Sequence, residues 1–156
     1  MPGSPIGSGL TREEIDRLVL CWFRADLMRD HVHSMRHECG QNLTALNRDD
    51  WWEFLTYLKY WLAGLFVLVE GINKLEIRDA RIQKLFNAQI GLLKKMRHET
   101  YHFVVSPAAI DETILRSDGL NWAEELQDAI GEHVREVAMR RADVERFWKI
   151  RKKKSD

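Results

Sequence analysis

The segment from Arg97 to His102 holds the richest group of side chains in this chain for carrying out chemistry. It reads Arg-His-Glu-Thr-Tyr-His, so one guanidinium, two imidazoles and a phenol lie within six residues. An imidazole can accept or donate a proton near neutral pH, and a guanidinium binds phosphate oxygens through two parallel N–H groups. These residue types therefore point to acid–base chemistry beside a phosphate group.

The segment lies near the end of a predicted long helix. Its arginine, tyrosine and two histidines lie on the face that points away from the core. A largely apolar set recurs at helical spacing and defines the core-facing arc: Ile82, Leu85, Phe86, Gln89, Leu93, Met96, Thr100 and Phe103. At about 100° per residue, the opposite arc carries Lys94, Arg97, His98, Tyr101 and His102. A packing histidine is usually found on the buried face with its nitrogens satisfied. The pattern therefore favours a functional role for the two histidines.

The spacing within the outer arc sets a condition on any site built there. Arg97 and His102 are five residues apart, which is about 140° around a regular helix. They would flank one ligand only if the last turn is distorted or a second copy of the chain completes the site. Pro107 is consistent with a helix end nearby.

An arginine followed by a polar residue and, five positions after the arginine, a histidine resembles the motif of the HEPN superfamily of small all-helical domains. Here these positions are Arg97, His98 and His102. The hydrophobic run from Leu65 to Gly71 is similar to the helix that precedes the motif in several HEPN branches, and the resemblance covers residues 50 to 148. It implies a metal-independent ribonuclease whose arginine and histidine line a cleft between two protomers.

On this hypothesis, each residue of the outer arc has a role. His102 acts as the general base on a ribose 2′-hydroxyl, and Arg97 stabilises charge on the phosphorane. His98 assists the leaving oxygen, while Lys94 and Tyr101 hold the flanking phosphate. No metal and no cofactor are expected, because the ribose supplies its own nucleophile.

Composition and periodicity predict an all-α protein. The chain has 156 residues, of which 45% are hydrophobic, and few prolines or glycines interrupt its periodic segments. We expect a HEPN-like bundle of four main helices plus a short connecting helix, in a single domain of residues 11–148. Residues 1–10, rich in Pro, Gly and Ser, are expected to be disordered, and residues 149–156 form a basic tail.

Capping signals predict where the first two helices begin. Thr11 and Glu14 form a capping box for a helix that extends to about Arg36. Asp49 or Asp50 is expected to cap the second helix.

Two further helices are expected after the motif. Ser106 and Pro107 should open the connecting helix over residues 108–115. Asn121 opens the last helix, on whose core stripe His133 is expected to pack as a buried histidine.

The second helix is the most apolar part of the chain. No residue from Tyr60 to Val69 is polar, so this helix is expected to be buried in a bundle or shared with a partner. Lys59 and Glu70 bracket only ten residues, fewer than the roughly 20 that a bilayer span needs, so no membrane association is expected. By the HEPN resemblance, Glu70 would orient Arg97; the alternative is that it marks where the helix returns to solvent.

A second group of potential ligands lies near the end of the first helix: His31, His33, His37 and Cys39. A structural zinc site usually needs two ligand pairs, and the second pair is missing here, so we favour a polar helix end over a metal site. The two cysteines are too few for a disulfide framework, and no secretory segment precedes them. A cytoplasmic location is therefore expected.

The chain end is basic although the whole chain is neutral. Residues 135–154 hold nine basic side chains against three acidic ones, beside Phe147 and Trp148. Such a segment can attract an RNA backbone and stack a base, or it can be a frayed terminus.

Together these features predict a HEPN-type endoribonuclease that acts on RNA as a homodimer, in a toxin or phage-defence role. An antitoxin or a regulatory protein is expected as a further partner. Some HEPN toxins carry a tyrosine two residues after the histidine, where a partner nucleotidyltransferase modifies it; Val104 occupies that position here and argues against that pairing. Two alternatives stay open, a non-catalytic RNA- or nucleotide-binding module and a helical protein-interaction module.

Overall fold

The computed structural model describes residues 10–40, 42–102 and 118–139, and every regular element in these ranges is helical. The elements are α1 (Arg12–Glu38), the short 3-10 helix η1 (Leu43–Ala45), α2 (Arg48–Lys74), α3 (Ala80–Ala88), α4 (Ile90–Tyr101) and α6 (Asn121–Met139). The prediction of an all-α helical bundle is confirmed.

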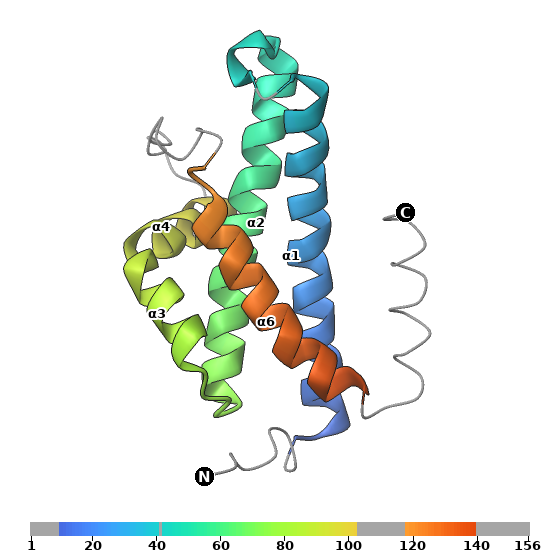
Figure 1. Cartoon of the computed structure of the whole chain (residues 1–156), viewed down its shortest axis with the longest axis vertical. Coiled ribbons are helices and arrows are strands. Elements are labelled where there is room, and N and C mark those ends of the chain that lie inside the picture. Colours follow the sequence, from blue (N-terminus) through green and yellow to red (C-terminus); the bar gives the residue numbers. More distant parts are fainter. Residues whose placement is uncertain (1–9, 41, 103–117, 140–156) are drawn as a thin grey trace.

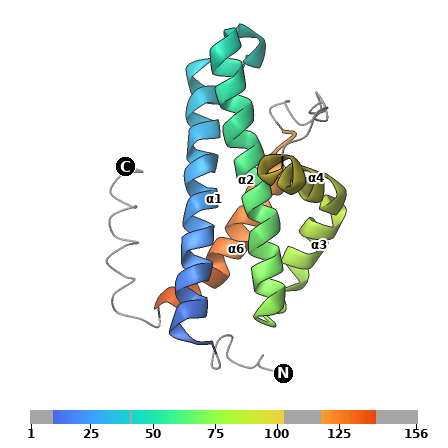
Figure 2. The ribbon, with the colours of Figure 1, turned by 180° about the vertical axis from the view of Figure 1, so that it is seen from behind.

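Two long helices form the frame of the molecule. α1 and α2 lie side by side as an antiparallel hairpin joined by η1 (Figure 1). α6 crosses both helices on one side, and α4 lies against the other side of α2 (Figure 2). α3 leads from the end of α2 back to α4 and packs against α6. α2 is therefore the helix around which the others are arranged.

The start of α1 follows the predicted capping box. The backbone N–H of Thr11 donates to Glu14 Oε2 at 2.8 Å, and the N–H of Glu14 donates to Thr11 Oγ1 at 3.3 Å. The helix ends at Glu38, two residues beyond the expected end, and Gly40 follows with φ 61. Glycine adopts this left-handed conformation without strain, so it suits the chain reversal after α1.

The cap of α2 differs from the prediction. Asn47, rather than Asp49 or Asp50, is the N-cap, and its side-chain oxygen accepts the N–H groups of both aspartates at 2.9 Å. The two aspartates lie instead in the first turn, where a negative charge interacts favourably with the helix dipole.

The apolar run of α2 is buried within this one chain. The residues of α2 that the bundle covers are Phe54, Leu58, Trp61, Leu62, Ala63, Leu65, Phe66, Leu68, Val69 and Ile72. Gly64 permits the close approach of α1, because a Cβ there would lie 3.1 Å from the Cβ of Ala25. α2 is long and apolar enough to satisfy a length-and-composition test for a membrane span, as a core helix also can, and 50% of the tested window is buried in the bundle.

The prediction of a single long helix from residue 82 onward is wrong, because the helix breaks at Gln89. This residue has φ −126 and ψ 16 and separates α3 from α4. Its N–H donates to the Phe86 carbonyl, so α3 ends in a tight turn. The break lets Phe86 be buried on α3 while Leu93 and Met96 are buried on α4, which packs along α2.

The last described helix agrees with its predicted start. α6 begins at Asn121 after a turn at residues 118–120, and His133 is buried on its core face as expected. Gly131 lies against Trp22 of α1, where a Cβ would approach the indole Nε1 to 3.1 Å. The expected connecting helix over 108–115, the N-terminal segment up to residue 9 and the tail after residue 139 lie outside the described residues.

Candidate functional site

Two contacts fix the last turn of α4 on α2. Glu99 Oε2 lies 3.0 Å from Lys59 Nζ, and only 5% of the Glu99 side chain is exposed. The hydroxyl of Thr100 also donates to the Lys59 carbonyl at 3.4 Å. Glu99 and Thr100 therefore form the inner side of the Arg97–His102 segment, and they set the orientation of its outer side.

The outer side of α4 is exposed, as the periodicity predicts. Its side chains are those of Lys94, Arg97, His98, Tyr101 and His102. The only acidic residue between Ile90 and His102 is the buried Glu99, which pairs with Lys59. The exposed face of α4 therefore carries an excess of positive charge, which suits an anionic ligand.

The guanidinium of Arg97 lies over an aromatic ring of α2. Its Cζ is 5.6 Å from the centroid of the Phe66 ring, a cation–π contact. Phe66 is itself held by the ring of Phe86 at 5.6 Å. Within the described part of the chain, no hydrogen bond or ion pair joins Glu70 to Arg97, the contact that the HEPN resemblance implies and to which the alternative was a residue where the helix returns to solvent. Phe66 is thus the α2 residue that positions the arginine.

The two histidines of the segment lie next to each other. Their ring centroids are 4.9 Å apart with an interplanar angle of 33°. His102 is the C-cap residue of α4, and its N–H still donates to the His98 carbonyl at 3.0 Å. Its own backbone is extended, with φ −130 and ψ 144, so the regular helix geometry behind the expected 140° separation from Arg97 does not apply. Two adjacent imidazoles can serve as a proton acceptor and a proton donor for one substrate.

Tyr101 has an aromatic partner that the sequence reasoning missed. The rings of Tyr60 on α2 and Tyr101 on α4 meet edge to face, with centroids 6.3 Å apart and an interplanar angle of 85°. Both residues are exposed, Tyr60 to 44% and Tyr101 to 57%. The signal that could have found Tyr60 is its place at the start of the apolar run, directly after Lys59.

The His and Cys group near the end of α1 does not converge on one point: His31 and Cys39 line a pocket between α1 and α2, whereas His33 lies on the side of α6. His31 stacks on Tyr57 of α2 at 4.4 Å, whereas His33 contacts Glu124 of α6. The thiol of Cys39 donates to the Arg36 carbonyl at 3.3 Å. No set of three or more His, Cys, Asp or Glu side chains in the described ranges is arranged to hold a metal ion.

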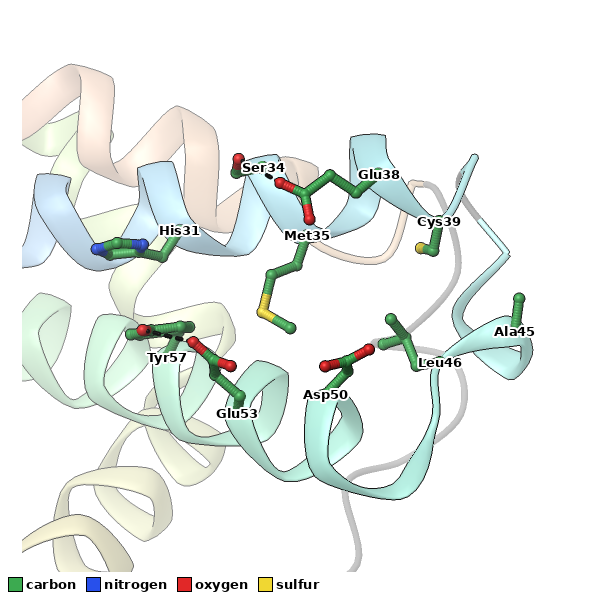
Figure 3. Close-up of a pocket in the computed structure, with 10 residues that line it drawn as sticks. All are labelled: His31, Ser34, Met35, Glu38, Cys39, Ala45, Leu46, Asp50, Glu53 and Tyr57. Carbon is green, nitrogen blue, oxygen red and sulfur yellow. Dashed lines mark hydrogen bonds between the residues drawn. The ribbon is translucent and has the colours of Figure 1, made fainter.

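A separate pocket lies where α1 ends and α2 begins (Figure 3). Its volume is about 530 Å³, and its carboxylates belong to Glu38, Asp50 and Glu53. Each accepts a hydrogen bond from a neutral donor, and the one between Glu53 and Tyr57, together with burial and the carboxylate charge, raises the pKa of the Tyr57 phenol. Because these carboxylates repel phosphate, the basic face of α4 is the better candidate for an anionic substrate.

The geometry of the α4 face combines three groups that phosphoryl chemistry needs. An imidazole pair, a guanidinium held on an aromatic ring and further exposed cations occupy one short helix. Comparisons with protein-family models, with curated proteins and with solved structures give no match for this chain.

Proposed function

We propose that this protein is a HEPN-type, metal-independent endoribonuclease, with its active site on the exposed face of α4. The observation that carries the proposal is the contact between the His98 and His102 rings on the helix that also exposes Arg97. The residue types, their order along the chain and their exposure agree with the Arg-polar-x-x-x-His motif of that superfamily.

In the proposed reaction, the RNA supplies its own nucleophile. His102 removes the proton from a ribose 2′-hydroxyl, and the oxygen attacks the adjacent phosphorus. The bond from phosphorus to the 5′-oxygen breaks, and that oxygen takes a proton from His98. Arg97 stabilises the negative charge that develops on the phosphorane oxygens. The products are a 2′,3′-cyclic phosphate and a free 5′-hydroxyl.

The described contacts support this assignment of roles. Arg97 rests on Phe66 instead of a carboxylate, so its N–H groups are not neutralised by an ion pair in the described residues. Lys94 is exposed on the same helix and is proposed to hold the flanking phosphate. The pair between Lys59 and Glu99 anchors the turn from which these side chains project.

We further propose that two copies of the chain join their α4 faces to complete the active site in the cytoplasm. The core residues of α2 are covered by the chain's own helices, so we assign the partner surface to the exposed, basic face of α4. RNA is the proposed substrate, and an antitoxin or regulatory protein would act on the same face. Val104, which bears on the choice of such a partner, lies outside the described residues.

The direct test is incubation of the purified wild-type protein with end-labelled total RNA in the presence of EDTA. The proposal expects cleavage that the chelator does not inhibit, with fragments that end in 2′,3′-cyclic phosphate. If the folded protein binds RNA but leaves it intact, the result favours the non-catalytic binding module instead.

A further inference from the structure

Two exposed tyrosines lie beside the proposed catalytic residues without a role in the proton transfers. Tyr60 and Tyr101 come from different helices and meet edge to face, at 44% and 57% exposure. An edge-to-face pair occupies one face of one ring only, so ring faces remain open to solvent. Exposed aromatic rings of this kind are suited to stacking on the flat surface of another ring.

The tyrosine pair is fixed relative to the catalytic histidines. Tyr101 is the last residue of α4, directly before His102, and Tyr60 directly follows Lys59, which anchors α4 through Glu99. The tyrosine pair and the His98–His102 pair therefore lie at the same end of α4.

The charge around the pair matches a nucleic acid. Exposed Lys94, Lys95 and Arg97 on α4 can approach phosphates, while the aromatic rings can stack on bases. Sequence-tolerant binding of single strands combines these two features, a basic surface along the backbone and aromatic rings under the bases. A paired base in a duplex does not offer its face in this way.

We propose that Tyr60 and Tyr101 form a base-stacking subsite, which holds an unpaired RNA base next to the phosphate to be cut. This inference rests on the proposed ribonuclease function, because it names the part of the RNA that the same face binds. It changes the expected role of Tyr101 as well: the ring acts on a base, and the hydroxyl is not needed for a phosphate.

The subsite can be tested by binding alone. Fluorescence anisotropy would measure the affinity of a short single-stranded RNA, and of a matched strand with abasic sites, in EDTA and on a His102→Ala background that prevents cleavage. Tyr60→Ala and Tyr101→Ala should each weaken binding of the intact strand by about 5- to 100-fold. Tyr60→Phe and Tyr101→Phe keep the ring and should bind within about twofold of the parent. The abasic strand should bind weakly and respond to none of these changes.

Trp52 provides the matched control for loss of an exposed aromatic ring. It is 59% exposed and has no ring contact among the described residues. It lies eight residues before Tyr60 on α2, which is about 12 Å along the helix. Trp52→Ala should therefore leave the affinity unchanged.

Several outcomes would overturn the subsite. The Phe variants could bind as weakly as the Ala variants, which would assign the role to the hydroxyl groups. The abasic strand could bind as tightly as the intact one, which would leave only phosphate contacts. The Tyr60→Ala and Tyr101→Ala variants could lose a dimer in light scattering while their RNA affinity stays unchanged, which would show that the tyrosine pair is a protein interface.

Failure of the subsite and failure of the ribonuclease are distinguishable. A wild type that binds the intact strand through both rings but never cuts RNA contradicts the ribonuclease and keeps the subsite. If the Tyr60→Ala and Tyr101→Ala proteins cut RNA as well as the wild type does, the ribonuclease proposal stands and the subsite is contradicted.

Discussion

Nε2 of His133 lies 2.7 Å from Oδ2 of Asp79, and this contact ties the last described helix to the start of α3. Asp79 is also the N-cap of α3, because its Oδ1 accepts the N–H of Ile82 at 2.9 Å. His133 is therefore the buried packing histidine that the sequence predicts. Among the described residues, its buried Nδ1 has no hydrogen-bond partner.

The first prediction concerns the stability of the fold in acid. Burial alone would raise the pKa of Asp79, but the hydrogen bond from His133 and two backbone amides outweigh it and lower the pKa below 3.8. A carboxyl with a lowered pKa in the folded state stabilises the protein at pH values above its unfolded pKa. That contribution is lost as the pH falls through the lowered value. Asp79→Asn should therefore flatten the fall of the melting temperature below about pH 4.

Circular dichroism melts from acid to neutral pH would measure this effect, with exposed Asp118→Asn as the control. Asparagine is also a good N-cap, so Asp79→Asn keeps most of the capping contribution, whereas Asp79→Ala should cost about 1 kcal/mol more. If the melting temperature falls equally at low pH in the wild type and in Asp79→Asn, the contact between Asp79 and His133 does not govern stability in acid.

The second prediction concerns the anchor of α4. Lys59→Met removes the cation that lies 3.0 Å from the carboxylate of Glu99, whose side chain is 5% exposed. Removing one partner of a buried pair costs about 3–5 kcal/mol, and the 22% exposure of Lys59 places this case near the lower end. Denaturant unfolding should show that loss, and RNA cleavage should fall because the turn that carries Arg97 loosens.

The double variant Lys59→Met/Glu99→Met is the matched control, because it removes both charges of this pair together. It should recover most of the stability of the wild type. If the single and double variants lose the same amount, the pair is not what holds α4 on α2.

The sequence predicted the local features better than the contacts between helices. The capping box at Thr11 and the exposed arc on α4 follow from neighbouring residues and from the helical period. Near the start of α2, three cap formers lie within four residues, and Asn47 is the one used. The break at Gln89 has no proline to mark it, and Gly91, two residues later, lies inside α4; we attribute the break to tertiary packing on α2 and α6. Phe66 beneath the arginine could not be found before the helices were placed together.

The third prediction tests the proposed catalytic residues. His102→Ala and Arg97→Ala should each lower RNA cleavage by at least about 100-fold, since a general base or a charge-stabilising group contributes that much. Both side chains are exposed, so their removal opens no cavity, and His102→Ala should change stability by no more than about 0.5 kcal/mol. Arg97→Ala also loses the contact with the Phe66 ring and should cost no more than about 1 kcal/mol. Single-turnover cleavage and thermal melts would measure the two effects separately.

The control variants replace residues of the same type at exposed positions away from α4. His37→Ala lies on α1 and Arg78→Ala lies between α2 and α3, and both should cut RNA as the wild type does. Equal losses in the controls and in the α4 variants would assign the activity to a general charge effect or to a contaminant.

The last prediction asks whether two copies share one active site. If the motif arginine of one protomer acts with the motif histidine of the other, Arg97→Ala and His102→Ala proteins are inactive alone but complement each other when mixed. A mixed dimer retains one intact arginine and one intact histidine across the interface, so part of the wild-type cleavage rate should return. The measurement is the cleavage rate at increasing ratios of the two variants, after dimers have been allowed to exchange. Light scattering on the same samples would report whether dimers are present. Dimers that exchange without any return of activity would show that each site is built within a single chain, on its own α4 face.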